Sequence, residues 1–251
     1  MRLSLVVPAY NEETRLAATL DAWRGYLERE RIDWEIVVVD DGSRDRTAAI
    51  VAEVGAGDAR VRLLTRPHLG KGAAVRAGML AATGEWRFMA DADLSMRPQE
   101  LPRFFGAAGQ PRFAVTVGSR EGPGARRIAE PIYRHLLGRL YNWLVRLLVI
   151  RGIEDTQCGY KLFTREAAEA LFTRQRLNGF GFDVEVLFLA RRLAFEVGEV
   201  PITWHYDPDS RVSLTKGLDA FLDIVRVRLN AGFRRYDAPS ASPRDPRAIV
   251  P

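Results

Sequence analysis

Asp91 and Asp93 form the pattern in this sequence whose chemistry is easiest to name. They are separated by one alanine and follow the apolar run Trp86–Ala90, so both carboxylates are expected at the tip of a strand. Two carboxylates placed in this way can reach one hard divalent cation. Mg²⁺ or Mn²⁺ prefers such oxygen ligands and keeps positions open for phosphates. A solvated turn also accounts for the pattern when it is taken alone.

Two further polar patterns could bind a nucleotide or a phosphate. Asp40 and Asp41 stand in the sequence DDGS after another apolar run, although DGS is also a common turn. Lys71 lies between Gly70 and Gly72 at the start of a helical pattern. An ammonium group and free backbone amides could therefore lie near a bound phosphate, although glycines are common at helix starts.

The elements that position these residues alternate between strand and helix. Short apolar runs predict strands at Leu3–Pro8, Glu35–Asp40, Val61–Leu64 and Trp86–Ala90. Helical spacing predicts helices at Glu12–Arg29, Arg46–Val54 and Lys71–Ala82. This order predicts an α/β fold with a mostly parallel sheet covered on both faces. Ligands bind such sheets beyond the carboxyl ends of the strands. Polar residues follow those ends at Ala9–Glu12, Asp40–Asp45 and Asp91–Ser95.

Length and composition limit the class of protein. The 251 residues are 47% hydrophobic and 27% charged, which is typical of a folded globular chain. The single cysteine, Cys158, excludes an internal disulfide and is interpreted as a small buried residue rather than a nucleophile. The first apolar run is too short for a signal peptide or a membrane span, so we expect an intracellular protein, soluble or bound to a membrane surface. Arginine supplies most of the positive charge, which suits anionic partners or reflects genomic base composition.

Two segments of the second half, Tyr133–Ile150 and Leu218–Asn230, place an apolar face beside arginines. Charges interrupt both segments, so neither is expected to cross a membrane. This pattern is typical of a helix lying in a membrane interface, although core packing or a dimer interface also explains it. The last stretch, Asp237–Pro251, holds four prolines and is predicted to be a mobile tail.

Four motifs in unbroken order resemble those of the family-2 glycosyltransferases of the GT-A fold. They are VVPAYNEE, VVVDDGSRDRT, GKGAAVRAG and DADLS, and the match covers about residues 3–120. The resemblance implies a nucleotide-sugar donor with Lys71 nearby. It implies that Asp91 contacts the ribose or the metal and that Asp93 holds the metal against the diphosphate. It also implies that the base and ribose are lined by Pro8, Tyr10, Glu12, Asp40 and Asp41.

The second half resembles the polyprenyl- and dolichyl-phosphate sugar transferases. The matching parts are GSR, which ends at Arg120, the arginine-bearing segment Arg126–Arg139, and DTQCGYKLF, which starts at Asp155. GFGFDVEVLFLARR and EVPITWHYDPDSRVSL are most similar to the dolichyl-phosphate β-glucosyltransferase branch. The mannosyltransferase branch usually reads TSGFR where this chain has TQCGYK, and it often has glutamine at the position of Ser95. The resemblance therefore implies UDP-glucose and a lipid phosphate, with GDP-mannose as the alternative and the third metal ligand unidentified.

The chemistry of this reaction sets requirements of its own. The leaving diphosphate must be stabilised by metal and cations, which Asp93 with its ion and Arg211 could supply. A phosphate-monoester acceptor has a second pKa of about 6, so it is mostly dianionic at neutral pH and needs no general base. It needs cations that hold it beside an anionic donor. Arg120, Arg127 and Arg134 are the candidate clamp, with Arg126 and Arg139 as further candidates and a solvated surface charge as the alternative for each.

The remaining candidates each have a structural alternative. Asp155 and Glu185 could position the sugar or a basic side chain, or could be buried structural carboxylates, and Asp155 is preferred because it lies in the subfamily motif. His205 could touch the donor phosphates or could be an ordinary loop residue.

We therefore expect one GT-A domain over residues 1–236, with a nucleotide-sugar half at 1–120 and an acceptor half facing the membrane at 121–236. The predicted enzyme is an inverting, metal-dependent glucosyltransferase that acts on dolichyl or polyprenyl phosphate at the cytoplasmic side of the cell membrane. Alternatives are a soluble acceptor and a nucleotide-sugar-binding module without catalysis. Nucleic-acid binding is disfavoured because no reader motif is present.

Overall fold

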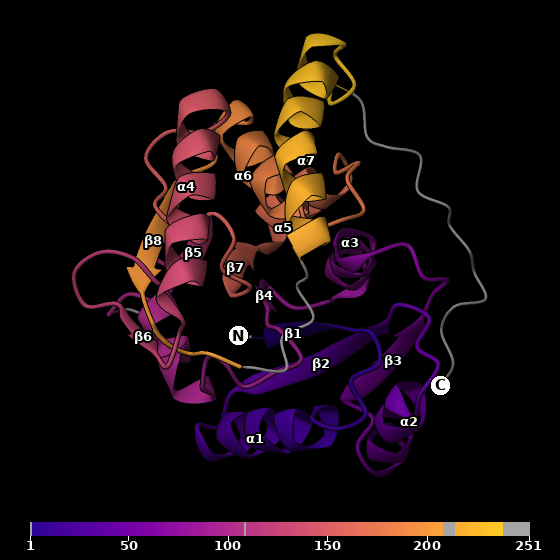
Figure 1. Cartoon of the computed structure of the whole chain (residues 1–251). Coiled ribbons are helices and arrows are strands. Elements are labelled where there is room, and N and C mark those ends of the chain that lie inside the picture. Colours follow the sequence, from indigo (N-terminus) through magenta and orange to yellow (C-terminus); the bar gives the residue numbers. More distant parts are fainter. Residues whose placement is uncertain (1, 108, 208–213, 238–251) are drawn as a thin grey trace.

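The computed structural model describes residues 2–107, 109–207 and 214–237, and its first half alternates strands and helices (Figure 1). The strands are Arg2–Ala9 (β1), Asp33–Asp40 (β2), Val61–Thr65 (β3) and Trp86–Met89 (β4). The helices are Leu16–Arg29 (α1), Thr47–Gly57 (α2) and Lys71–Ala81 (α3). The strands and helices predicted for this half are therefore confirmed, with small shifts at their ends.

The largest shift is at α1, which begins at Leu16 and not at Glu12. The main-chain oxygen of Glu12 accepts the N–H groups of Arg15 at 3.1 Å and Leu16 at 2.9 Å, so residues 12–15 form a turn ahead of the helix. The N–H of Glu12 donates to Thr47 Oγ1 at 2.7 Å, and its carboxylate binds the Arg15 guanidinium. These bonds keep residues 12–15, which follow the end of β1, outside the helix.

The chain after β4 contains elements of which the sequence pattern indicated only the two amphipathic segments. Its strands are Val115–Ser119 (β5), Arg126–Ile128 (β6), Lys161–Thr164 (β7), Val197–Pro201 (β8) and Thr203–His205 (β9). Its helices are the 3₁₀ helix Pro98–Phe104 (η1), Ile132–Leu148 (α4), Arg165–Phe172 (α5), Phe182–Arg192 (α6) and Leu214–Gly232 (α7). The two amphipathic segments correspond to α4 and α7. The predicted tail lies outside the described residues except for Asp237.

One sheet joins the two halves, with the strand order β3-β2-β1-β4-β7-β5-β8. Its neighbours are parallel except at β7, which runs antiparallel to both β4 and β5. Because β7 is reversed, its first residue, Lys161, pairs with Met89 at the end of β4. The segment that precedes β7 therefore reaches the same edge as the residues that follow β4. Strands β6 and β9 form a separate parallel pair.

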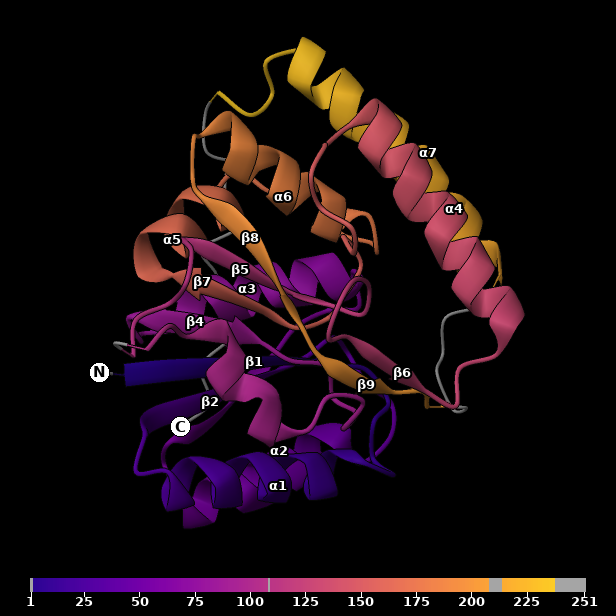
Figure 2. The same cartoon turned by 90° about the vertical axis from the view of Figure 1, so that its left-hand side faces the viewer.

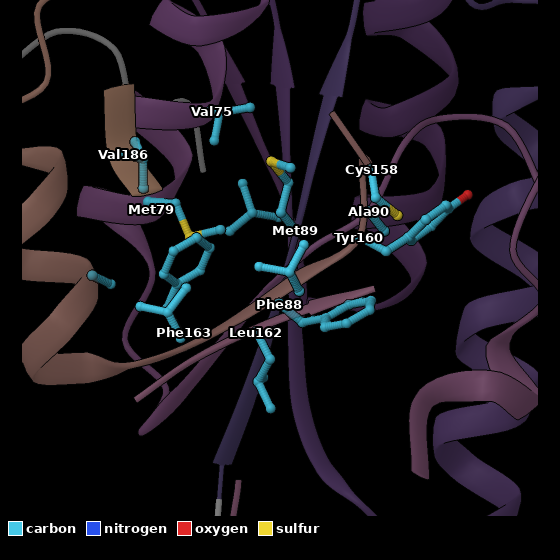
Figure 3. Packing of buried hydrophobic residues seen from close by; sticks show 14 of the residues in the cluster. Val75, Met79, Phe88, Met89, Ala90, Cys158, Tyr160, Leu162, Phe163 and Val186 are labelled. Atoms are coloured by element: carbon cyan, nitrogen blue, oxygen red, sulfur yellow. The ribbon is translucent and has the colours of Figure 1, made fainter. Parts of the chain in front are cut away.

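Helices α1 and α2 cover one face of the first half of the sheet and α3 covers the other (Figure 1). Figure 3 shows how β4 and β7 pack with α3 and α6, through side chains that include Val75, Phe88, Leu162, Phe163 and Val186. These side chains are almost fully buried, and each such burial stabilises the fold by about 1.5–3 kcal/mol. The same core cluster extends from Leu3 to Tyr236 and includes residues of both halves.

Helices α4 and α7 lie side by side on the outside of the second half (Figures 1 and 2). Their outward side, called the α4–α7 apolar face below, carries large apolar side chains that are at least half exposed. These are Ile132, Tyr133, Leu136, Leu140, Trp143, Leu147, Leu222, Val225, Leu229 and Phe233. Core packing therefore does not explain the apolar residues on this side of the two helices. Within the described ranges, no helix has the length and apolar character needed to cross a bilayer.

Candidate active site

A cavity of about 600 Å³ lies at the carboxyl ends of β1, β2 and β4, where the sequence predicts the site. This volume is within the usual range for small-molecule sites. The cavity brings together residues from all four ordered motifs. Seven of the predicted site residues line it: Pro8, Tyr10, Glu12, Asp41, Lys71, Asp91 and Asp93.

The two aspartates that follow β4 have different charge environments. Lys71 Nζ donates to Asp91 Oδ1 at 2.6 Å. Burial opposes the charge of Asp91, but the Lys71 ammonium outweighs it and lowers the pKa of Asp91. Burial and the negative charge of Asp91 raise the pKa of Asp93. Asp93 is therefore a partly buried carboxylate that a bound cation would stabilise in its charged form.

The donor atoms fit a hard divalent metal. Carboxylate oxygens of Asp91 and Asp93 are the ligand type that Mg²⁺ or Mn²⁺ prefers. In the part of the chain that the structure describes, no third His, Cys, Asp or Glu joins them in a metal-binding cluster. Such a site would leave the other coordination positions to water and to the diphosphate of a substrate.

The DTQCGYKLF motif supports both aspartates. The Tyr160 hydroxyl lies 3.3 Å from Asp93 Oδ1 and accepts the main-chain N–H of Met96 at 3.0 Å. A Cβ atom at Gly159 would overlap the Asp91 carboxylate, so any larger residue there would displace that carboxylate. Gly159 and Tyr160 therefore position the two aspartates, a role that sequence reasoning missed although it identified the motif.

Asp41 organises the wall of the cavity. Its carboxylate accepts the N–H groups of Leu69 at 3.0 Å and Gly70 at 2.9 Å and lies 2.7 Å from His68 Nδ1. The His68 ring stacks on the Tyr10 ring, with centroids 4.0 Å apart. His68 lines the cavity and was missed from the sequence because it lies in a loop and follows no strand-end pattern.

The sequence suggested that the backbone amides at the start of α3 are free to bind a phosphate. In the structure two of them are already paired. The N–H of Gly70 donates to Asp41, and the N–H of Ala73 donates to the main-chain oxygen of Asn178 at 3.2 Å. Lys71 still supplies the expected cation at this position.

Arg120 and Asp155 form a buried pair outside the cavity lining. Arg120 Nε and Nη2 donate to the two carboxylate oxygens of Asp155 at 2.7 and 2.8 Å, and the Arg120 main-chain N–H adds a bond at 3.0 Å. Burial opposes the charge of Asp155, but Arg120 outweighs it and lowers the pKa of Asp155 to about 2. The Arg120 guanidinium lies over the Trp204 ring at 5.3 Å. Asp155 thus fixes the orientation of Arg120.

The other predicted cations are placed differently. Arg127 also lies outside the cavity lining and binds Glu121 at 2.7 Å and Glu130 at 2.6 Å. The side chain of Arg134, on α4, and the whole of Arg211 lie outside the described residues.

Four further residues considered from the sequence do not line the cavity. Asp40 is buried away from the cavity and accepts the N–H of Ser43 at 3.1 Å. Cys158 is buried, and burial raises the pKa of its thiol to about 12, which confirms the structural interpretation. Glu185 accepts two main-chain N–H groups and the Tyr236 hydroxyl. His205 lies outside the cavity lining.

The far wall of the cavity comes from the second half of the chain and was not predicted. It consists of the loop before α6 and two residues of α7, namely Arg176, Leu177, Asn178, Gly179, Phe180, Asp223 and Arg226. The loop packs closely on α3, since a Cβ atom at Gly72 would lie 2.7 Å from the main-chain oxygen of Leu177. Arg15, which follows Glu12 by one turn, also lines the cavity and was missed.

The sequence and the fold define the class of protein. Residues 4–172 match the family described as glycosyl transferase family 2, and the chain belongs to that family. The fold is GT-A. A crystal structure of glucosyl-3-phosphoglycerate synthase from Mycobacterium tuberculosis with Mn²⁺, UDP and glucosyl-3-phosphoglycerate has a TM-score of 0.68 and 19% identity, covering 96% of this chain and 81% of that one.

Relatives with more similar sequences indicate one branch of this family. A dolichyl-phosphate beta-glucosyltransferase of Trichomonas vaginalis is 38% identical over 237 residues, which span 90% of this chain and 70% of the relative. The dolichyl-phosphate beta-glucosyltransferase of Homo sapiens is 37% identical over 243 residues, which span 91% and 75% of the two chains. These relatives agree with the branch that the sequence motifs indicated.

Proposed function

We propose that this protein is an inverting, metal-dependent glucosyltransferase that moves glucose from UDP-glucose to dolichyl or polyprenyl phosphate at the cytoplasmic surface of a membrane. The observation that carries the proposal is the position of α7. One side of this helix lines the cavity that holds Asp91 and Asp93, and another side belongs to the exposed α4–α7 apolar face. A lipid-borne acceptor and a nucleotide sugar could therefore meet at this helix. The names of the curated relatives support the same donor sugar and acceptor.

The proposed donor site uses the residues of the first half. Pro8, Tyr10, Glu12 and Asp41 would hold the base and ribose, while Asp40 supports the turn that carries Asp41. Asp93 and Asp91 would hold the metal, which when bound neutralises the diphosphate as it leaves. Lys71 keeps Asp91 ionised and adds positive charge beside the leaving group.

The proposed reaction is a single displacement. A phosphate oxygen of the acceptor forms a bond to the anomeric carbon from the face opposite the diphosphate, and the bond from that carbon to UDP breaks, so UDP departs and the configuration inverts. The acceptor is already dianionic, so no side chain has to remove a proton. Arg120, Arg127, Arg134 and Arg211 remain the predicted cations. For Arg120 and Arg127, binding the acceptor requires exchange of their present carboxylate partners.

The α4–α7 apolar face is proposed to bind a bilayer. A contiguous exposed apolar surface of this kind marks an interaction site. Arginines stand at its margins, among them Arg139 and Arg146 on α4. Anionic lipid headgroups complement that charge, and the apolar side chains enter the boundary of the acyl layer.

The decisive experiment is transfer of radiolabelled sugar. The protein receives UDP-glucose or GDP-mannose with a short polyprenyl phosphate and Mn²⁺ or Mg²⁺. Asp93→Asn tests the metal site, and Asp21→Asn, which removes an exposed carboxylate on α1, is the matched control. Organic-extractable glucose that is lost only in Asp93→Asn supports the proposal. Extractable mannose, or sugar transferred only to a soluble phosphorylated acceptor, contradicts it.

The membrane contact is tested separately. Sedimentation with vesicles of anionic and zwitterionic lipid should show binding that weakens as salt rises, because salt screens the arginines. A protein that forms dimers through α4 and α7 and does not sediment with vesicles would contradict the proposed surface.

A further inference from the structure

Helix α7 faces the donor cavity with some residues and belongs to the α4–α7 apolar face with others. Asp223 and Arg226 line the donor cavity, while Leu222, Val225 and Leu229 belong to the α4–α7 apolar face. Residues three or four positions apart are neighbours on a helix surface, so Arg226 lies directly between Leu222 and Leu229 along the edge of the apolar stripe. Arg226 therefore stands where the cavity and the apolar face meet.

The position of Arg226 is set by a buried partner. Arg226 Nη1 donates to Asp223 Oδ1 at 2.7 Å, and Asp223 Oδ2 accepts the N–H of Gly181 at 3.2 Å. The Asp223 side chain is 7% exposed, whereas that of Arg226 is 55% exposed. A guanidinium has five N–H donors in a planar fork, and the bond to Asp223 uses one of them. Arg226 can thus bind phosphate oxygens in two-point fashion while Asp223 holds it in place.

Other cations near the donor site are less accessible. Lys71 binds Asp91, Arg15 binds Glu12 and Asp207, and the Arg120 side chain, which is paired with Asp155, is 18% exposed. The side chains of Lys71, Arg15 and Arg120 are 22%, 22% and 18% exposed, against 55% for Arg226. Arg176, which also lines the cavity, is less exposed than Arg226 and donates to the main-chain oxygen of Arg235. An incoming anion therefore reaches Arg226 more readily than these cations.

Where a protein surface enters a membrane, a lipid phosphate is oriented in one way relative to that surface. Its chain lies among the apolar side chains of the membrane layer and its phosphate lies just above them. Arg226 is at that level, because its neighbours one turn away, Leu222 and Leu229, are exposed and apolar. Its position on the cavity wall also places it on the side of α7 that faces Asp93.

We infer that Arg226 binds the phosphate group of the lipid acceptor and holds it at the entrance of the donor cavity. This inference rests on the proposed function and adds a binding residue to it. Asp223 is the positioning residue for Arg226. Arg228 lies on the opposite margin of the same apolar stripe, away from the cavity lining, and has no such role.

The test compares Arg226→Ala, Arg226→Lys and the matched control Arg228→Ala, each of which is judged first by its unfolding curve. Steady-state kinetics give the KM for a short polyprenyl phosphate and the KM for UDP-glucose. Titration in detergent micelles with UDP and Mn²⁺ gives the affinity for the same lipid without turnover. The corresponding polyprenol, which lacks the phosphate, is the control ligand.

Arg226→Ala is expected to raise the acceptor KM and weaken lipid-phosphate binding by about 10- to 100-fold, since a charge-assisted hydrogen bond is lost. Arg226→Lys should recover part of the loss. The KM for UDP-glucose, polyprenol binding and all properties of Arg228→Ala should change by less than about threefold, because none of them involves the phosphate contact.

The other outcomes separate the two proposals. Unchanged acceptor binding in Arg226→Ala overturns the role of Arg226 and leaves the transferase proposal intact. Equal effects in Arg226→Ala and Arg228→Ala, or a rise confined to the KM for UDP-glucose, also overturn it. If the wild-type protein binds the lipid phosphate but forms no glucosyl lipid, the proposed function fails while the binding titration still tests Arg226. If the wild-type protein neither binds nor transfers, both proposals fail.

Discussion

Asp155→Asn is the substitution whose effect on stability follows most directly from the structure. Asparagine keeps the shape of the side chain but removes the charge that faces Arg120. The Asp155 side chain is fully buried, and its two oxygens accept three N–H bonds from Arg120. The substitution therefore leaves a guanidinium in a poorly solvated site without a countercharge.

The size of the effect can be worked from the pKa of Asp155. It falls from an ordinary value of 3.8 to about 2 in the folded protein. At about 1.4 kcal/mol for each pKa unit, the carboxylate stabilises the fold by roughly 2.5 kcal/mol at neutral pH. Removing one partner of a buried pair costs about 3–5 kcal/mol. We therefore expect the free energy of unfolding to fall by about 2.5–5 kcal/mol. For a chain of this length the melting temperature should fall by roughly 5–20 °C.

The pH dependence has a definite sign. The folded pKa is lower than the unfolded pKa, so the stabilisation is complete above about pH 5 and is lost as the pH falls toward 2. Roughly half of it should be gone at pH 3. Urea unfolding of wild type and Asp155→Asn from pH 7 to pH 3 measures this directly. The gap between the two proteins should narrow by about 1 kcal/mol.

A surface pair provides the control. Glu53→Gln removes a carboxylate from the exposed pair with Arg46 and should cost less than about 1 kcal/mol at any pH. If Asp155→Asn were no more destabilising than Glu53→Gln, or if its effect did not change between pH 7 and pH 3, the assignment of a buried, charge-stabilised Asp155 would be wrong.

Three further predictions concern the site and the surface. Tyr160→Phe removes the hydroxyl beside Asp93, so the Mn²⁺ concentration for half-maximal activity should rise several-fold while the fold is retained. An unchanged metal requirement would exclude the positioning role of Tyr160. Gly159→Ala places a methyl group against the Asp91 carboxylate, so transfer should fall at least about tenfold, and normal kinetics would show that this packing does not matter. Trp143→Ser should weaken vesicle binding without changing UDP binding measured by calorimetry, and a loss of UDP binding would contradict the separation of the two surfaces.

The first half of the fold could be predicted because local sequence and burial coincide there. Strands β1 and β2 are buried on both faces and read as continuous apolar runs, as in Leu3–Pro8. Polar residues such as Asp41 and Asp93 come directly after such runs, and parallel strands bring those ends to one edge. The cavity lies at that edge.

The far wall of the cavity could not be predicted in the same way. Residues 176–180 and Asp223 reach the site because the loop before α6 packs on Gly72 and α7 packs on Gly181. These contacts join segments that are far apart in the chain and leave no periodic pattern. The direction of β7 was also hidden, because one reversed strand of four residues looks the same as a parallel one in sequence.

The amphipathic helices show a third limit. A helix that packs on a core and a helix that lies on a surface carry the same spacing of apolar residues, as α4 does with Leu136, Leu140 and Leu147. Only the exposure of these side chains in the folded chain separates the two explanations. This exposure excludes core packing as the explanation for these side chains. A membrane or a second protein chain remains.

The reversed strand β7 also has a consequence for how the chain is made. If β4 pairs with β1 before β7 has been made, the other edge of β4 stays unpaired until β7 follows. At about 5–20 residues per second, a ribosome needs roughly 4–14 seconds to make the roughly 70 residues between them. During that time β4 is an open edge, which can pair with another nascent chain. Proteolysis of chains stalled before and after β7 should show when this edge becomes protected.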